Sequence, residues 1–298
     1  MGLTAIVLGA AAGGGFPQWN CNCAVCRLAW AGDPRVRART QASLAVSADG
    51  HRWTLLNASP DLRAQIQTTP ALQPKGLRDT PIEAVVLTGG EIDQTAGLLS
   101  LRERSPFMLM ATAATLAAVA GNPMFSALAP DVVSRRAITP GEKFALGGLQ
   151  AEFFMVPGKL PLYLEGENPA TAEESAANVG VEISDGNKRL AYVPGAAEMT
   201  PSLRHRLSRA DAILFDGTLF SDDEMIRTGT GTKAGRRMGH MPIDGEGGSL
   251  LALEGLSARK IFVHINNTNP ILVDGSPERR RVESAGWEVA FDGMEIAL

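Results

Sequence analysis

Short apolar runs rich in β-branched residues recur along the whole chain, and Gly, Pro, Asn or Asp closes each of them. Such runs are typical of β-strands, because branched side chains pack well on a pleated surface and turn residues end the extended stretch. The pattern predicts strands at residues 4–8, 43–47, 53–56, 84–87, 107–110, 149–156, 180–183, 189–193, 212–215, 260–265 and 287–291.

Helical stretches separate some of these strands. We expect helices at residues 93–103, 112–120, 200–209 and 247–253. The order mixes hairpin-like strand pairs with strand–helix units, which favours an α/β (α+β) fold of two mixed sheets packed face to face with helices outside. Residues 165–177 are polar and rich in small side chains, so we interpret them as an excursion loop. No break in composition divides the chain, and we expect one domain over residues 1–298.

Composition limits the class of protein. The 298 residues are 45% hydrophobic and 20% charged, enough for a large core, and the net charge of −4 indicates neither a nucleic-acid footprint nor attraction to an anionic membrane. The apolar N-terminus lacks the basic residues of a secretory signal, and no apolar run reaches the ~18 residues that span a bilayer. We expect a cytoplasmic protein with small or peptidic partners and no membrane insertion.

All the cysteines of the chain, Cys21, Cys23 and Cys26, follow directly after a glycine-rich loop at residues 13–20. Three thiolates bind zinc well, and a fourth ligand from elsewhere would close a structural site. A disulfide framework would need distant partners, and the sequence has none. Structural metal is the favoured interpretation, and reactive thiols or unliganded cysteines are the alternatives.

Two predicted strands end in residues that suit a metal or proton-transfer site. Glu91 and Asp93 follow the strand at 84–87, where α/β folds place ligands, although Asp93 could instead cap the next helix. His264 ends the strand at 260–265 and is a candidate metal ligand, or else a hydrogen-bonded core histidine. Asn267 and Asn269 follow it with amide oxygens that could reach the cysteines.

Two further segments could carry chemistry. Asp216 follows the strand at 212–215 and is either a functional carboxylate or part of a simple Asp-Gly turn. The glycine-rich loop at 229–242 has neither Walker nor Rossmann spacing, so nucleotide binding is weakly indicated. This loop is either a clamp for substrate carboxylates or a solvated basic segment, and its polar residues include Lys233, Arg236, Arg237 and His240.

Residues 7–23, which join the first strand to the cysteines through Gly-Gly-Gly-Phe-Pro-Gln-Trp-Asn, closely resemble the pyrroloquinoline quinone (PQQ) biosynthesis protein B family. Residues 91–103, 229–243 and 264–272 are similar to the same family, so the resemblance covers nearly the whole chain. It implies a metallo-β-lactamase fold, an αββα four-layer sandwich.

The superfamily's metal signature, His-x-His-x-Asp-His, falls on Gly89, Glu91, Asp93 and Gln94, so only the aspartate is kept. A later histidine position falls on Lys159 and a bridging aspartate near Gly195, whereas the final histidine is kept as His264. The resemblance therefore implies one metal, held by Asp93, His264 and a third group such as Glu91. One carboxylate with histidines suits non-haem Fe(II) better than two-metal hydrolysis.

Related RNA-processing and phosphodiesterase enzymes have an acid and a histidine beside the metal, at positions that resemble Asp216 and His240. Either His240 completes a facial triad with Asp93 and His264, or Asp216 orients His240 as an acid/base. We interpret the cysteine cluster as a zinc site that joins the N-terminal loop to the strand end near His264. We choose Asn269 as its first candidate for the fourth ligand and Asn267 as the second, where a phosphodiesterase subfamily places a histidine.

The family resemblance implies a reaction: Fe(II)- and O2-dependent hydroxylation of the tyrosine ring in a peptide-derived Glu-Tyr precursor of PQQ, with other proteins of the pathway as partners. The cationic residues Lys233, Arg236 and Arg237 would hold the carboxylates of this precursor. Two alternatives stay open: a metal-dependent hydrolase, and a non-catalytic carrier that moves PQQ or its precursor toward the periplasm.

Overall fold

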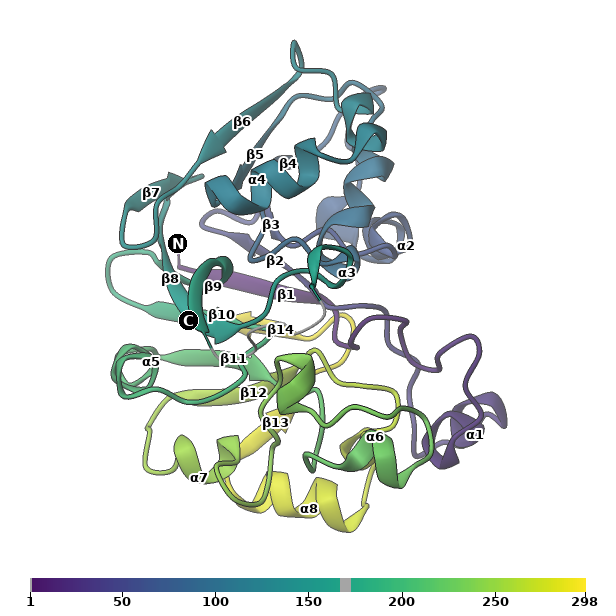
Figure 1. Cartoon of the computed structure of the whole chain (residues 1–298). Helices are drawn as coiled ribbons and strands as arrows, with labels where there is room; N and C mark the ends of the chain where they lie inside the picture. Colours follow the sequence, from purple (N-terminus) through teal and green to yellow (C-terminus); the bar gives the residue numbers. More distant parts are fainter. Residues whose placement is uncertain (1, 167–172) are drawn as a thin grey trace.

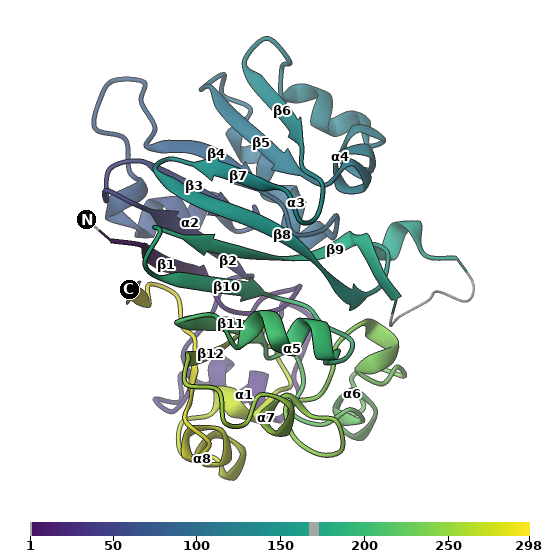
Figure 2. The same ribbon diagram turned by 90° about the vertical axis from the view of Figure 1, so that its left-hand side faces the viewer.

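A computed structural model describes residues 2–166 and 173–298, which form two seven-stranded sheets stacked face to face (Figures 1 and 2). In order across the first sheet, the strands are β14 (Glu295–Ala297), β1 (Thr4–Gly9), β2 (Ser43–Ser47), β3 (Trp53–Leu56), β4 (Ile82–Val86), β5 (Phe107–Ala111) and β6 (Val133–Ala137). Across the second sheet they are β13 (Trp287–Val289), β12 (Arg259–Val263), β11 (Ala212–Asp216), β10 (Arg189–Val193), β9 (Glu173–Ser184), β8 (Leu149–Gly158) and β7 (Lys143–Leu146).

The apolar strands are buried on both faces. In β1, Ala5 and Val7 lie in the core between the sheets, whereas Ile6 and Leu8 lie in a cluster on the outer face. Side chains alternate across a strand, so a continuous apolar run predicts a sheet that is covered on both sides. This burial, with helices outside both sheets, confirms the expected αββα arrangement.

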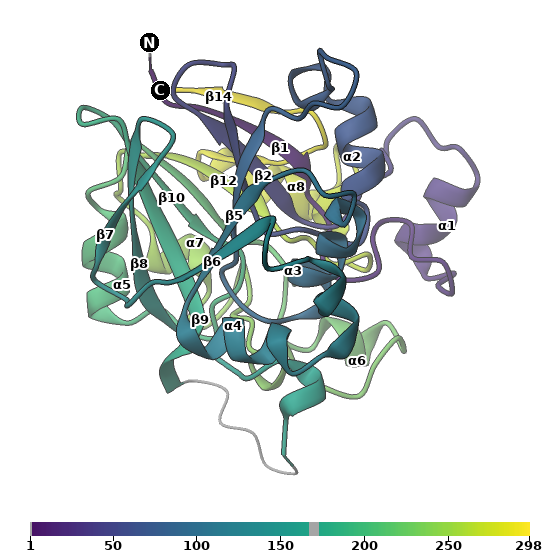
Figure 3. The ribbon, with the colours of Figure 1, turned by 90° about the horizontal axis from the view of Figure 1, so that it is seen from above.

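Helices cover both outer faces (Figure 1). The first sheet carries α2 (Leu62–Thr68), η1 (Pro70–Leu72), α3 (Ile92–Thr95), η2 (Ala96–Leu101), α4 (Ala113–Ala120) and η3 (Pro123–Ala127). The second carries α5 (Pro201–Leu207), α7 (Ser249–Ala252) and α8 (Pro277–Ser284), with η6 (Pro270–Leu272). At the periphery are α1 (Ala24–Trp30), which lies at one flank (Figure 3), α6 (Glu224–Arg227), η4 (Leu162–Leu164) and η5 (Arg236–Met238). Within the described ranges, no helix is both long and apolar enough to span a bilayer.

Every strand predicted from the sequence is present, but the sequence pattern missed some elements. The predicted helix at 93–103 is divided into α3 and η2. The helix α8 was missed because Val282 is its buried residue, so it has no apolar stripe. The predicted excursion loop is partly wrong, since Glu173–Ser184 forms β9 and its first residues pair with the end of β8. Residues 167–172 of that loop lie outside the described residues.

The sheet topology brings distant loops to one edge of the sandwich. Strands β10 to β13 are mutually parallel, as are β3 to β6, so within each set the carboxyl ends lie along one edge. The segments after β4, β10, β11 and β12 contribute to the lining of one cavity, together with the end of β8. Polar residues that are far apart in sequence therefore meet there.

A close backbone contact fixes the helix that carries Asp93. The Gly97 N–H donates to the Ala58 carbonyl at 2.8 Å, and the Ala58 N–H donates to the Gln94 carbonyl at 2.7 Å. A Cβ atom on Gly97 would lie 2.1 Å from the carbonyl oxygen of Ser59. Glycine at this position is what allows α3 and η2 to lie against the segment after β3.

We predict that Gly97→Ala lowers the free energy of unfolding by about 1–3 kcal/mol, because backbone atoms must move to accept the methyl group. Calorimetry should show a melting temperature several degrees lower. Gly166→Ala is the matched control, since a Cβ there meets no atom of the described residues within 4 Å. Equal melting temperatures for the two variants would contradict the proposed close contact.

Candidate functional site

A cavity of about 560 Å³ opens at the edge where these loops meet. Its lining includes Asp93, Lys159, Thr218, Arg237, His240 and His264. The volume lies within the ~300–1,000 Å³ range of small-molecule sites. The cavity thus gathers six of the eight residues that the sequence proposed for the active site and the substrate, all except Asp216 and Arg236.

Asp93 and His264 meet across the two sheets. Asp93 is in the first turn of α3, and its Oδ2 atom lies 2.9 Å from Nε2 of His264, which follows β12. Burial alone would raise the pKa of Asp93, but the hydrogen bond and charge of His264 outweigh it and lower the pKa. Burial lowers the pKa of His264, but the hydrogen bond and charge of Asp93 outweigh burial and raise it.

The carboxylate of Asp216, at the end of β11, is fully buried and fully hydrogen-bonded. Its Oδ2 accepts from Nδ1 of His240 at 2.7 Å and from the Ala196 N–H at 2.9 Å. Its Oδ1 accepts from the N–H and the hydroxyl of Thr218, at 3.0 and 2.6 Å. A carboxylate offers about four acceptor sites, so Asp216 has none left. Burial would raise its pKa, but the charge and hydrogen bond of His240 lower it.

The two histidines lie side by side. Their ring centroids are 5.1 Å apart at an interplanar angle of 19°, and one ligand atom from each lies within 4.8 Å of the other and of Asp216. Because Asp216 is saturated and engages Nδ1 of His240, it orients this ring, and Nε2 remains for a ligand. The group that lies within 4.8 Å is thus Asp216 with the two imidazoles, and Asp93 contacts this group at Nε2 of His264. Carboxylates and imidazoles together are ligands that suit a divalent transition metal.

Glu91 also lines the cavity, but its carboxylate is paired with Lys159 instead of with the histidines. Its Oε1 accepts from Nζ of Lys159 at 2.8 Å, and the Leu162 N–H donates to the same carboxylate at 3.2 Å. Lys159 also pairs with Glu165. Burial would lower the pKa of Lys159, but the hydrogen bonds to Glu165 and Glu91 raise it.

The two further positions where the superfamily signature has histidine are occupied by residues that pack together. The Gln94 Oε1 accepts from the Glu91 N–H at 3.1 Å at the start of α3. A Cβ on Gly89 would lie 2.5 Å from that oxygen. Gln94 therefore has a structural role at the helix start.

The basic residues of the loop at 229–242 have different surroundings. Lys233 and Arg237 line the cavity, and Nη1 of Arg237 is buried without a hydrogen-bond partner among the described residues. In contrast, Arg236 donates to the carbonyls of Glu246 and Gly247 at 3.0 and 3.4 Å. Arg236 therefore braces the loop, which corrects its expected place among the substrate-binding residues.

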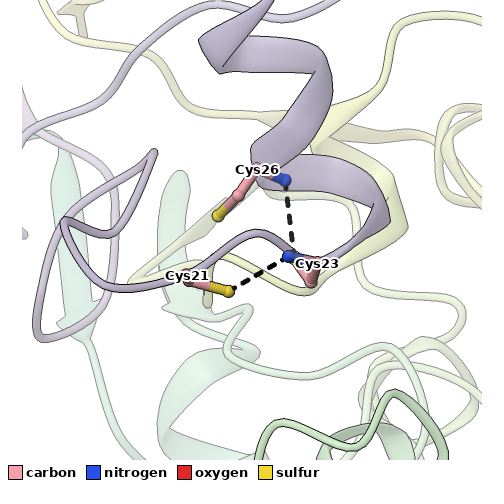
Figure 4. A group of neighbouring side chains, drawn as sticks. All are labelled: Cys21, Cys23 and Cys26. Atoms are coloured by element: carbon pink, nitrogen blue, oxygen red, sulfur yellow. Dashed lines mark hydrogen bonds between the residues drawn. The ribbon is translucent and has the colours of Figure 1, made fainter.

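The three cysteines converge at the start of α1 (Figure 4). Their sulfur atoms lie within 4.8 Å of one another. Two sulfurs bound to one zinc at about 2.3 Å each are at most about 4.6 Å apart, so the cluster is close to the required size. Burial raises the pKa of the Cys26 thiol to about 12, so a thiolate there needs a neighbouring cation.

Asn267, the second choice for a fourth ligand, lies against this cluster. Its side-chain amide is 3.3 Å from Sγ of Cys26, and its backbone carbonyl oxygen is 3.7 Å from Sγ of Cys23. Asn269, the first candidate for the fourth zinc ligand, is instead hydrogen-bonded elsewhere. Its Oδ1 accepts from the Ile271 N–H at 3.1 Å, and its amide nitrogen donates to the Gly217 carbonyl at 2.9 Å.

Comparison with known proteins shows the family. The model of the "Beta-lactamase superfamily domain" matches residues 52–265. The coenzyme PQQ synthesis protein B of Rhizobium meliloti is 58% identical over 298 residues, covering 99% of this chain and 98% of that protein. The Methylobacterium nodulans protein of the same name is 57% identical over 299 residues, covering 99% and 100%. The chain belongs to the coenzyme PQQ synthesis protein B family.

A solved structure of this family has the same fold. Zn(2+)-bound PqqB from Methylobacterium extorquens superposes with a TM-score of 0.97 at 54% identity, covering 99% of this chain and 100% of that one. The family resemblance and the metallo-β-lactamase fold predicted from the sequence are confirmed. Sequence reasoning missed Thr218 and the Lys159–Glu165 pair. A threonine two residues after a strand-end aspartate was the available signal for Thr218.

Proposed function

We propose that this member of the family acts in PQQ synthesis as an Fe(II)- and O2-dependent hydroxylase of the tyrosine ring in a Glu-Tyr precursor. The names of its relatives support a role in that pathway. The choice of iron chemistry rests on the four hydrogen bonds to the Asp216 carboxylate. Because its acceptor sites are all occupied, we propose Asp93, His240 and His264 as the metal donors. Two histidines and one carboxylate with open positions are typical of non-haem iron oxygenases.

In this proposal, Asp93 and the Nε2 atoms of His240 and His264 hold the iron, and Asp216 positions His240. The bound iron supplies the activation of O2. In the overall reaction, one atom of O2 would be inserted into a ring C–H bond and the other would leave as water, with two electrons and two protons supplied by an external reductant. The protein's own contribution is to orient the ring and to keep competing water out of the cavity.

Lys233 and Arg237 anchor the carboxylates of the substrate. An unpaired guanidinium N–H that is shielded from water costs free energy, and a ligand carboxylate would relieve that cost. Arginine binds carboxylates through two parallel N–H donors, which fixes orientation as well as position. The partly apolar cavity walls leave room for the aromatic ring beside these cations.

We also propose a structural zinc ion held by Cys21, Cys23, Cys26 and Asn267. This ion would join the N-terminal loop to the segment after β12, where Asn267 follows His264 by three residues. The backbone already joins these segments, since the Ala12 N–H donates to the Ile265 carbonyl at 2.9 Å. The zinc would then hold the histidine-bearing strand end in place.

We predict that anaerobic reconstitution with Fe(II), followed by O2, ascorbate and a Glu-Tyr peptide, gives oxygen consumption and a product heavier by one oxygen atom. Asp93→Ala or His264→Ala should lose the iron and the product. Asp131→Ala is the control, because Asp131 is a surface carboxylate paired with Arg104.

Other outcomes decide between the alternatives. A product without added oxygen would sink the hydroxylase proposal. Anaerobic turnover of a phosphoester or peptide with zinc or manganese would favour the hydrolase. Stoichiometric binding of quinone with no metal beyond the cysteine site would favour the carrier.

We predict that Arg237→Ala raises the KM for the Glu-Tyr peptide by about 10- to 100-fold, the value of a hydrogen-bonded charge pair of about 1.5–3 kcal/mol. The measurement is steady-state oxygen consumption over a range of peptide concentrations. Arg227→Ala, which removes an exposed arginine bonded to Ser221, should leave KM unchanged. An unaltered KM in Arg237→Ala would show that the Arg237 guanidinium does not bind substrate.

We predict that the purified protein carries about one zinc ion that Cys23→Ser loses and Asp93→Ala keeps, since the ligands of the two centres are different. Elemental analysis after gel filtration measures the metal. The melting temperature of Cys23→Ser should fall, and chelator treatment of the wild type should give the same fall. If the wild-type protein contains no zinc and chelator treatment leaves its melting temperature unchanged, the structural zinc site is ruled out.

A further inference from the structure

We propose that Thr218 is a positioning residue whose hydroxyl sets the ring tautomer of His264, so that Nε2 of this histidine presents a lone pair to the metal. This inference rests on the proposed metal centre. It assigns a role to Thr218, which the sequence analysis treated only as part of the turn after Asp216. Thr218 is 5% exposed and lines the cavity beside both histidines.

The Thr218 hydroxyl lies at the centre of the polar cluster. Its oxygen is 2.6 Å from Oδ1 of Asp216 and 2.8 Å from Nδ1 of His264. It is also 3.0 Å from Nδ1 of His240 and 3.0 Å from the backbone oxygen of His264. One hydroxyl thus contacts the buried acid and both rings.

A hydroxyl has a single proton, which decides the direction of these bonds. The contact with the Asp216 carboxylate is the shortest, in the range of charge-assisted O–H···O bonds, so Thr218 donates there. Its lone pairs then face Nδ1 of His264, and that nitrogen must carry a proton in order to donate. At His240, Oδ2 of Asp216 likewise accepts from a protonated Nδ1.

Fixing the proton on Nδ1 determines what the opposite nitrogen can do. A neutral imidazole with Nδ1–H has a lone pair on Nε2. On His264 that lone pair would point at the Asp93 carboxylate, 2.9 Å away. A proton on Nε2 makes this contact the hydrogen bond described above, and a metal ion would replace that proton between the two groups. Thr218 therefore selects the arrangement in which His264 and Asp93 share a positive charge.

The backbone holds the hydroxyl rigidly at this point. A Cβ on Gly217 would lie 2.8 Å from Cβ of Phe262, so glycine allows the β11 turn to lie close against β12. The amide of Asn269 donates to the Thr218 carbonyl at 3.3 Å, and the Asn266 N–H donates to the same carbonyl at 3.0 Å. His264 has a left-handed backbone with φ of 55°, a strained conformation that is common at functional sites.

The test measures metal binding and the tautomer rather than activity alone. Anaerobic titration with Fe(II) against a competing chelator should show that Thr218→Val weakens binding about 10- to 100-fold, as is typical when a group that orients a ligand is lost. Thr218→Ser, which keeps the hydroxyl, should restore the affinity. Thr115→Val is the control, because it removes a buried hydroxyl that contacts Thr112 outside the cavity.

The second measurement needs no variant. In the Zn(II)-loaded wild-type protein labelled with 15N, long-range 1H–15N spectra report which ring nitrogen of each of the four histidines carries a proton. His240 and His264 should both show Nδ1–H. A proton on Nε2 of His264 overturns the proposal, as does wild-type Fe(II) affinity in Thr218→Val. Failure to hydroxylate the Glu-Tyr peptide would count against the proposed reaction, and the zinc-loaded spectra report on Thr218 independently of it.

Discussion

The buried charge of Asp216 is the constraint on which the candidate site depends. A carboxylate removed from water costs several kcal/mol unless its oxygens are hydrogen-bonded. Here the donors come from Ala196 after β10, from Thr218 after β11, and from His240 on the glycine-rich loop. Because each donor belongs to a different segment, the satisfied carboxylate fixes where those segments lie relative to one another. The ring of His240 and the hydroxyl of Thr218 are oriented as a consequence.

The site also joins the two sheets. Asp93 follows a strand of the first sheet and His264 a strand of the second, and they are in contact only because the sandwich packs as it does. Gly97 contributes from the first sheet, where its missing side chain lets the Asp93 helix approach the segment after β3. The cysteine cluster contributes from the second, through Asn267 next to the end of β12. Packing at Gly97 and at the cysteine cluster thus helps to set the distance between Oδ2 of Asp93 and Nε2 of His264.

The sequence predicted those parts of this arrangement that depend on local pattern. Apolar runs located the strands, and the polar residues at their ends, Asp93, Asp216 and His264, are the ones that meet. The sequence could not show which of two adjacent residues points into the cavity and which points away from it. Arg236 and Arg237 are adjacent, yet Arg236 braces a loop and Arg237 lines the cavity.

The same difficulty explains the error over the asparagines. Asn267 lies on the thiols, while Asn269 ties η6 to the β11 turn. The amide nitrogen of Asn269 donates to the carbonyls of Gly217 and Thr218, more than fifty positions away along the chain, so no spacing rule in the sequence reports these contacts. Likewise, Glu91 is separated from Asp93 by one residue, but its carboxylate is taken by Lys159 from the end of β8.

Gly89, Gln94 and Lys159 stand at positions where the superfamily signature has histidine ligands, and each of them has another role beside the cavity. Gln94 is used at the start of α3, and a Cβ on Gly89 would meet the end of the Gln94 side chain, 2.5 Å from its Oε1. Lys159, at a position where the superfamily has a histidine, instead carries an ammonium group between Glu91 and Glu165. The single ammonium group balances one of these two carboxylates and occupies their oxygens, so both acids are engaged in ion pairs and less available to a cation. A metal in the proposed function would therefore take its donors from Asp93, His240 and His264 rather than from this ion-paired cluster.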